Sequence, residues 1–203
     1  GSGSGLYDAD GREYLDLVSG IGVASLGHAH PGLAAAIADQ VSTLIHVSNL
    51  YYHPLQGEAA ARLTELTGLA RVFFSNSGAE AVEGCLKFAR RYWYTQGITS
   101  RTGFVAIEGG FAGRTMGALS VTWDEHYRAP FQPLIGPVTF VASGDTAALE
   151  AAVTDRTAAI IAEPIQGEGG IRPMSREFAQ AITGVCRRTG TILIADEVQT
   201  GLG

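Results

Sequence analysis

Several residue types are scarce in this sequence of 203 residues, which contains two cysteines, one lysine and only 17% charged residues. Cys85 and Cys186 lie far apart and form no C-x-x-C motif, which predicts a reduced, cytoplasmic protein. No basic segment followed by an apolar one opens the chain, so we predict no signal peptide. Residues 17–38 contain no charged side chain, but their glycines and Pro31 break the pattern of a membrane-spanning helix.

Positive charge is also scarce. The formal net charge is -6, and the basic residues are scattered along the chain. This balance argues against a nucleic-acid partner and against an anionic membrane surface. No internal repeat or low-complexity tract is present. His28 and His30 have no cluster of acids or cysteines in the sequence around them, so we predict no metal site.

The N-terminal part, residues 1–30, predicts a β-hairpin within residues 6–17 followed by a glycine-rich segment. The opening GSGSG is either a flexible linker or native sequence, and the pattern leaves both open. Pro31 suits the first turn of a helix. A second helix is expected from Leu55 to about Thr67, ended by Gly68.

Beyond these helices, short apolar runs rich in β-branched and aromatic residues recur along the chain. They occupy residues 71–75, 104–108, 138–142, 158–163 and 191–196. Helix-like segments separate most of them, at residues 79–94, 146–153 and 175–188. Continuous apolar runs indicate strands that are buried on both faces, and strands alternating with helices indicate a mostly parallel sheet. We therefore predict an α/β fold, with residues 31–203 forming one domain or part of one.

Polar or glycine-rich turns follow four of these runs. They are SNSGAE at residues 75–80, EGGFAGRT at 108–115, EPIQGEGG at 163–170 and DEVQTG at 196–201. In parallel sheets, ligands bind beyond the carboxyl ends of the strands. We therefore expect these turns to gather at one edge of the sheet.

The first of these turns predicts a capped helix. Ser77 and Glu80 have the spacing of a capping box, in which the Ser77 side chain accepts from the Glu80 N–H and Glu80 reaches back to the Ser77 N–H. The N–H groups of Gly78 and Ala79 are then free to bind an anion such as phosphate. The alternative is a well-capped helix with no ligand.

Asp196 stands at the end of a buried strand, where an ionised carboxylate requires a partner. A P-loop NTPase would supply a metal, but the chain has no G-x-x-x-x-G-K-[ST] motif, and its only lysine, Lys87, lies within a predicted helix. The other candidate partner is a protonated heterocyclic nitrogen. Pyridoxal phosphate has such a nitrogen and a phosphate, and Phe111 offers a flat face for its ring, unless Phe111 is only a core aromatic.

The ordered motifs SNSGAEA, FAGRT, EPIQGEGG and DEVQTGLG resemble those of the class-III, fold type I pyridoxal-phosphate aminotransferases. The similarity covers the whole chain, and it is closest to the acetylornithine branch with its succinylornithine and ornithine relatives. It implies that the chain forms the N-terminal half of such an enzyme, an incomplete cofactor-binding large domain. It also implies a homodimer and a cytoplasmic location.

The resemblance implies a role for each site residue. The predicted cofactor-binding residues are Ser77, Gly78, Ala79, Phe111, Glu163, Asp196, Val198 and Gln199. Asp196 would pair with the ring nitrogen and act in catalysis. Arg114 would bind a substrate carboxylate, for which its planar fork is suited, and Glu168 would help to select the substrate.

Two features depart from the family pattern. Ala112 stands where the family commonly has His or Trp, and the family's Schiff-base lysine is expected beyond Gly203. Lys87 is not expected to replace it, because an ion pair with Glu83 four residues earlier explains Lys87 better.

The implied activity is amino transfer between an N-acylated ornithine-type donor and 2-oxoglutarate, as in arginine biosynthesis, with residues 1–203 alone inactive. The alternatives are a non-catalytic fragment that binds pyridoxal phosphate or another chain, and an aminotransferase for ornithine, succinylornithine or 4-aminobutyrate. A nucleotide-binding module is disfavoured because the chain lacks both a P-loop and a G-x-G-x-x-G motif.

Overall fold

A computed structural model describes residues 1–202 of the chain. The chain divides into two compact units, Gly1–Val72 (unit 1) and Phe73–Gly203 (unit 2), and each is described by itself. Gly203, the last residue of the predicted second domain, lies outside the described residues. The division predicted at residue 30 stays a prediction.

Unit 1 begins with the predicted hairpin. Strands β1 (Gly5–Tyr7) and β2 (Glu13–Leu15) pair in antiparallel fashion. One carboxylate oxygen of Asp8 accepts the N–H groups of Asp10 and Arg12, each at 2.9 Å, and so shapes the turn between the strands. The opening GSGSG takes part in this fold, because Gly5 starts β1 and Gly3 exchanges two backbone hydrogen bonds with His28.

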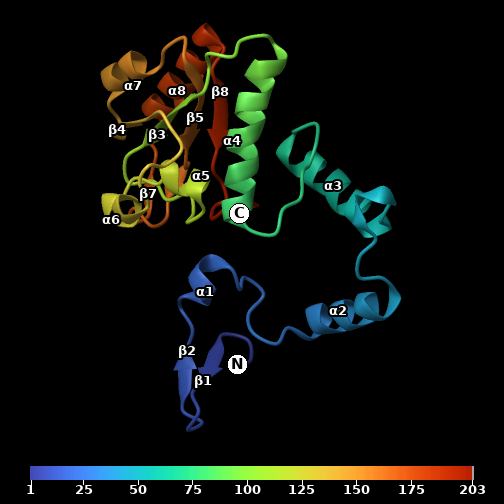
Figure 1. Ribbon diagram of the computed structural model, residues 1–203. Coiled ribbons are helices and arrows are strands. Elements are labelled where there is room, and N and C mark those ends of the chain that lie inside the picture. The colour runs from blue at the N-terminus through green and yellow to red at the C-terminus, as the bar shows by residue number, and fades with distance from the viewer. Residues whose placement is uncertain (203) are drawn as a thin grey trace. The chain divides into compact units, whose positions relative to one another are not determined.

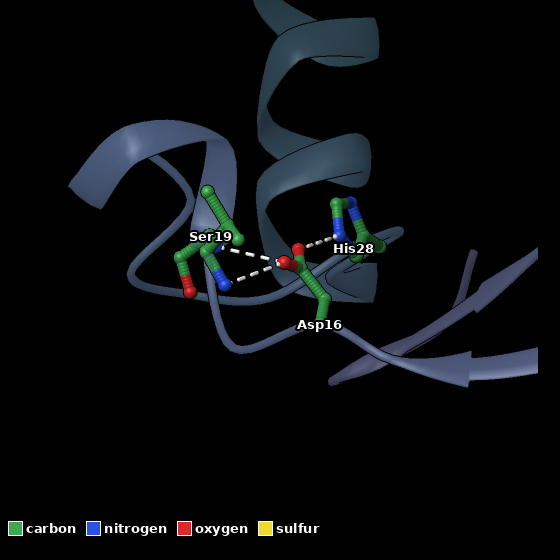
Figure 2. Close-up of polar contacts among 4 residues, drawn as sticks. Asp16, Ser19 and His28 are labelled. Atoms are coloured by element: carbon green, nitrogen blue, oxygen red, sulfur yellow. Dashed lines mark hydrogen bonds and ion pairs between the residues drawn. The ribbon is translucent and has the colours of Figure 1, made fainter.

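A left-handed turn follows the hairpin. The residues of α1 (Ser19–Gly22) all have positive φ, including 50° at Ser19 and 62° at the β-branched Ile21. Figure 2 shows what holds the start of this turn: Asp16 Oδ1 accepts the Ser19 N–H at 2.8 Å, while Asp16 Oδ2 lies 2.7 Å from His28 Nε2. These contacts hold a backbone conformation that non-glycine residues rarely adopt.

Two longer helices complete unit 1, and both match the sequence-based prediction. Helix α2 (Pro31–Thr43) has proline at its first position, and His30 Nδ1 accepts the Leu33 N–H at 3.2 Å. Helix α3 (Pro54–Thr67) follows the 3-10 turn η1 (Ser48–Leu50), and Gly68 ends it in the left-handed conformation with φ 70°. Neither α2 nor α3 contains a buried residue.

Unit 2 is built on a four-stranded parallel sheet with the order β4-β3-β5-β8 (Figure 1). The strands are β3 (Gly103–Ile107), β4 (Val138–Val141), β5 (Thr157–Ala162) and β8 (Ile192–Ala195). All residues of β3 and β5 are buried, as expected for strands covered on both faces. Four of the five predicted strands, and the parallel α/β fold, are thus confirmed.

Helices cover both faces of this sheet. On one face, α4 (Gly78–Thr95) and the short α5 (Met116–Ser120) form a core with alternate strand residues such as Phe104 and Ile161. On the other, α7 (Thr146–Ala152) and α8 (Arg176–Thr189) pack on the intervening residues, such as Val105 and Ile160. Figure 1 shows α4 on one side of the sheet and α7 and α8 on the other. The side-chain alternation of a strand thus produces two separate cores.

Smaller elements join these parts, and the sequence predicted none of them. They are α6 (Glu125–Arg128), the 3-10 turn η2 (Ala129–Phe131), and the antiparallel pair β6 (Ile165–Gln166) and β7 (Arg172–Pro173).

The strand predicted at residues 71–75 is wrong, because these residues form no strand. No strand within residues 1–202 pairs with them, and an apolar run becomes a strand only where a neighbouring strand satisfies its backbone groups. Every helix in the described residues is either too short or too polar to cross a lipid bilayer.

Candidate functional site

The carboxyl ends of three neighbouring strands meet in unit 2, as the sequence predicted. Phe111 follows β3, Glu163 directly follows β5, and Asp196 directly follows β8. All three line one narrow pocket, together with Ala112 and Gln166. The structure therefore brings together residues that are far apart in sequence, such as Phe111 and Asp196.

Asp196 is buried, with 8% of its surface exposed. Its N–H donates to the Ala162 carbonyl, which continues the pairing of β8 with β5, and its Oδ1 accepts the Val198 N–H at 3.2 Å. Burial raises the pKa of the Asp196 carboxyl, and the Val198 N–H only partly offsets this effect. Within residues 1–202, no cationic side chain forms an ion pair with Asp196.

Glu163 joins two loops of the site through its carboxylate. Oε1 accepts the Phe111 N–H at 2.8 Å, and Oε2 accepts the Gly167 N–H at 3.1 Å. Burial is the main cause that raises the pKa of Glu163; these two N–H groups oppose it, while the nearby charges of Asp196 and Glu168 add to it. Glu163 therefore fixes the backbone beside Phe111 while it shares a pocket with Asp196.

The N-terminus of α4 has the predicted cap, with one correction. Ser77 Oγ accepts the Glu80 N–H at 3.2 Å, as expected. The Glu80 carboxylate, however, accepts from Asn76, through its N–H at 2.8 Å and its side-chain amide at 2.9 Å, so the predicted return bond to the Ser77 N–H is wrong. The Asn76 side chain is the reason, because it gives the carboxylate a second donor on the same residue. Among the described residues, the N–H groups of Gly78 and Ala79 have no hydrogen-bond acceptor.

Val198 and Gln199 each lie against a glycine. A Cβ placed on Gly78 would fall 2.5 Å from Val198 Cγ1, so the Val198 side chain covers the first residue of α4. The Gln199 amide lies against Gly167, where a Cβ would overlap its oxygen. The missing Cβ of Gly78 lets the backbone approach the branched Val198 side chain, whereas the flexible end of Gln199 can move away from a Cβ at position 167.

The loop that carries Phe111 is held by one hydroxyl group. Thr122 Oγ1 lies 3.0 Å from the Ala112 nitrogen, whose N–H donates to it, and 3.2 Å from the Gly113 carbonyl oxygen, to which it donates. Gly113 is buried with φ 128°, and a Cβ there would fall 2.8 Å from the Cβ of Ala79. The loop thus passes close to the start of α4.

Arg114 is exposed, and its guanidinium carbon lies 5.4 Å from the Phe111 ring centroid and 3.7 Å from that of Tyr127. Within the part of the chain that the structure describes, Arg114 donates no hydrogen bond and forms no ion pair. Glu168 lines a cavity of about 240 Å³ whose walls include Phe111 and Tyr127. Arg114 and Glu168 therefore both lie beside the Phe111 loop, with the N–H donors of Arg114 free.

The predicted ion pair between Lys87 and Glu83 is wrong. Glu83 Oε1 instead accepts the N–H groups of Gly117 and Ala118, at 2.7 and 3.3 Å, at the start of α5. Backbone N–H groups from a segment distant in sequence thus bind this carboxylate, and residue spacing along a helix cannot predict such hydrogen bonds. Lys87 itself is exposed on α4.

Sequence reasoning missed three residues that shape the site. Glu83 and Thr122 hold the backbone on either side of Arg114, and Tyr127 stacks on its guanidinium. Each acts through a contact that only the folded chain forms. An acid facing the buried side of α4 is a weak clue for Glu83, and we find none for Tyr127.

Comparison with known proteins identifies the class to which this fold and site belong. The family model described as Aminotransferase class-III matches residues 1–203. The chain therefore belongs to the class-III aminotransferase family.

Relatives within this family are named acetylornithine aminotransferase. The protein of that name from Archaeoglobus fulgidus is 50% identical over the whole chain, which covers 52% of its length. The one from Methanopyrus kandleri is 48% identical, and the chain covers 51% of it. The chain thus spans about half the length of the curated relatives it matches.

Solved transaminase structures share the fold. An ornithine aminotransferase from Toxoplasma gondii, in which pyridoxal phosphate partly occupies the active site, matches with a TM-score of 0.92 and 33% identity, over all of this chain and 49% of its own. A pyridoxal-phosphate-bound amine transaminase from an uncultivated Pseudomonas species matches with a TM-score of 0.91 and 33% identity, over all of this chain and 52% of its own. These matches confirm the predicted fold class, and pyridoxal phosphate is the cofactor of the family.

Proposed function

We propose that this chain is part of a pyridoxal-phosphate-dependent enzyme that transfers an amino group from an N-acylated ornithine-type donor to 2-oxoglutarate. The buried carboxylate of Asp196, which has no cationic partner among the described residues, is the observation that carries this proposal. A protonated ring nitrogen satisfies such an acid, and the free N–H groups that start α4 suit a phosphate. The residues present therefore fit the cofactor of the family.

Asp196 stabilises the protonated state of the ring nitrogen. Each unit by which the carboxylate raises the pKa of the ring nitrogen stabilises its protonated form by about 1.4 kcal/mol. Ser77, Gly78 and Ala79 hold the phosphate at the positive end of α4. When bound, the cofactor supplies a ring that takes up the electron pair released as the amino donor loses a proton.

The remaining residues orient the ring and bind the substrate. Phe111 and Val198 would pack against the ring when it is bound, and Gln199 would bind near its phenolic oxygen. Glu163 holds the Phe111 backbone through the bond at 2.8 Å. Arg114 binds a substrate carboxylate through its free N–H donors, and Glu168 contributes to substrate choice beside it.

The names of the relatives support the choice of donor. The proteins that are 44–50% identical to this chain carry the name acetylornithine aminotransferase. We accordingly propose N-acetylornithine as the donor, in arginine biosynthesis. The ornithine aminotransferase among the solved structures favours ornithine as the second candidate, and succinylornithine and 4-aminobutyrate are tested beside it.

The test uses the holoenzyme expressed from the whole reading frame, supplied with pyridoxal phosphate. Glutamate formation from 2-oxoglutarate should be fastest, as kcat/KM, with N-acetylornithine among the four donors. Asp196→Asn should lower kcat about 100- to 1000-fold, in line with the loss of one preorganised electrostatic group. Asp155→Asn, at an exposed position, is the matched control. Full activity of the Asp196→Asn variant, or no turnover of any donor by the wild type, contradicts the proposal.

Two matched serine caps test the phosphate site. Ser77 and Ser175 both cap long helices by accepting a backbone N–H, at 3.2 and 3.1 Å. Each change to alanine should cost about 1 kcal/mol of stability. Only Ser77→Ala should weaken pyridoxal phosphate binding, measured by titration of the protein freed of cofactor. Equal cofactor affinity in the two variants contradicts the assignment.

Residues 1–203 alone are proposed to be inactive, because their only lysine, Lys87, is exposed on α4 and away from the pocket residues of the site. A homodimer and a cytoplasmic location are proposed from the family resemblance. The net charge of -6 supports the absence of nucleic-acid and membrane partners.

A further inference from the structure

Tyr127 stacks closely on Arg114 and has no role in the proposed function. The guanidinium carbon of Arg114 lies 3.7 Å from the Tyr127 ring centroid. A cation within about 6 Å of an aromatic centroid is attracted by the ring, and arginine stacks there with its flat face. The edge of the guanidinium, which carries the N–H donors, is left free for a ligand.

The fold holds the Tyr127 side of this stack in place. Tyr127 lies in α6, which Asp124 caps by accepting the His126 N–H at 2.9 Å. The next residue, Arg128, donates to the Trp123 carbonyl at 3.1 Å, and its guanidinium carbon lies 4.6 Å from the ring centroid of Phe140 in β4. The short helix is thus fixed to the sheet by the residue that follows Tyr127.

The other side of the stack is equally fixed. The backbone before Arg114 is held by the Thr122 hydroxyl, which bonds to both Ala112 and Gly113. The backbone after it leads into α5, whose first N–H groups donate to Glu83. The long Arg114 side chain is therefore the mobile part, and the Tyr127 ring, at 3.7 Å, restrains it more closely than the Phe111 ring at 5.4 Å.

We propose that Tyr127 is a positioning residue, which holds the Arg114 guanidinium flat so that its N–H edge faces the substrate carboxylate. This inference rests on the proposed function, because it requires that Arg114 binds a carboxylate. A preordered guanidinium loses less side-chain freedom when the substrate binds. Tyr127 therefore lowers KM for carboxylate-bearing donors and leaves kcat unchanged.

The test compares two donors in the holoenzyme. N-acetylornithine carries the carboxylate, and N-acetylputrescine is the same molecule without it. Tyr127→Leu should raise KM for N-acetylornithine about two- to fivefold, the range of an exposed cation–π contact. KM for N-acetylputrescine should not change, and kcat for both donors should stay within about twofold. Tyr127→Phe keeps the ring and should restore KM for N-acetylornithine.

A second tyrosine–arginine stack provides the matched control. Arg91 lies 5.4 Å from the ring centroid of Tyr94 on the exposed side of α4. Tyr94→Leu removes a looser contact of the same kind and should leave KM unchanged for both donors. In the background of Arg114→Ala, adding Tyr127→Leu should give no further rise in KM for N-acetylornithine, because the two residues act as one unit.

Three results overturn the proposal: an equal change in KM for both donors in Tyr127→Leu, no rescue by Tyr127→Phe, or additive effects in the double variant. If Arg114→Ala itself fails to discriminate between the donors, the carboxylate assignment of the proposed function fails first, and this inference fails with it. If Tyr127→Leu does not fold, as judged by circular dichroism, Tyr127→Met gives the same comparison with a longer, unbranched side chain.

Discussion

The two units of this chain hold their helices and strands in place through different kinds of interaction. In unit 2 the sheet lies between two clusters of buried side chains. Unit 1 has well-formed helices and a hairpin, yet none of the 22 buried hydrophobic residues of the described chain belongs to it. Its helix caps and turns are local, hydrogen bonds link Gly3 and Asp16 to the more distant His28, and large apolar side chains such as Leu17 and Leu50 are more than 80% exposed.

This difference shows that local sequence signals and core packing contribute separately to the structure and its stability. A proline at the start of a helix and a left-handed glycine at its end define where α3 begins and ends. They add little free energy, because most helical stability comes from packing of an apolar face. Unit 1 is therefore shaped by its sequence but not stabilised within itself.

Expressing the units separately should give the largest contrast. Residues 1–72 should show no cooperative thermal transition by circular dichroism, because they bury no core that could offset the loss of chain entropy. Residues 73–203 should unfold cooperatively. A sharp unfolding transition in the isolated N-terminal piece would show that this comparison is mistaken.

A matched pair of leucines tests the contrast residue by residue. Leu149 in α7 is fully buried, and Leu66 in α3 is 64% exposed. In the whole chain, Leu149→Ala should lower the free energy of unfolding by about 2–5 kcal/mol, through lost burial and the cavity left behind. Leu66→Ala should change it by less than about 1 kcal/mol. Denaturant unfolding measures both, and similar losses for the two variants would contradict the assignment of the core.

Asp196 provides the next contrast. Because its carboxylate is buried, it should lower the free energy of unfolding when no cofactor is bound. Its pKa is higher in the folded chain, so the folded state keeps the proton to higher pH. The free energy of unfolding then falls as pH rises from the ordinary range of an aspartic acid to the raised pKa.

Asp196→Asn should reduce this fall, to which Glu163 with its own raised pKa also contributes, and stabilise the cofactor-free protein by about 1–3 kcal/mol at neutral pH. Removing the charge also relieves Glu163, whose pKa Asp196 helps to raise. Thermal unfolding across pH, with Asp155→Asn as control, measures the difference. A variant less stable than the wild type at neutral pH would count against a buried, unpaired acid.

Asp16 in unit 1 should show the opposite sign and the smallest effect. Its pKa is lowered, first by the hydrogen bond with His28 and then by the N–H groups of Ser19 and Val18. The stability it adds is present above the ordinary range of an aspartic acid and is lost as pH falls through the lowered pKa. In the Asp16→Asn variant, the hydrogen-exchange protection of the Val18 and Ser19 amides, measured by NMR, should no longer depend on the protonation of residue 16. Unchanged pH dependence of that protection would rule the contact out.

The sequence predicted the regular elements well where one local pattern decides them. The strands β3, β4, β5 and β8 were visible as apolar runs, and α4 and α8 as the segments between them. Two of the failures share one physical cause, which is a partner distant in sequence, whereas the predicted return bond of Glu80 failed because of the nearby Asn76. No strand in the described part of the chain pairs with residues 71–75, and Glu83 bonds to α5 instead of Lys87.

The candidate site was predictable for a similar reason. Asp196 and Glu163 each follow a strand directly, so the parallel topology alone places them at one edge. Side chains that do not follow a strand directly have no such rule. Tyr127 lies in the short helix α6, 13 residues after Arg114, and only the folded chain shows that they stack.

The register of β8 against β5 has a consequence for how this chain tolerates insertions and deletions. Ala162 pairs with Ala195 in the last row of these two strands, which places Glu163 and Asp196 directly beyond that row at neighbouring strand ends. Losing or gaining a single residue within Ile192–Ala195 would turn every following side chain to the opposite face. Length variants should therefore be purged from this strand during evolution, while the exposed connection at residues 132–136 can change length without moving either acid.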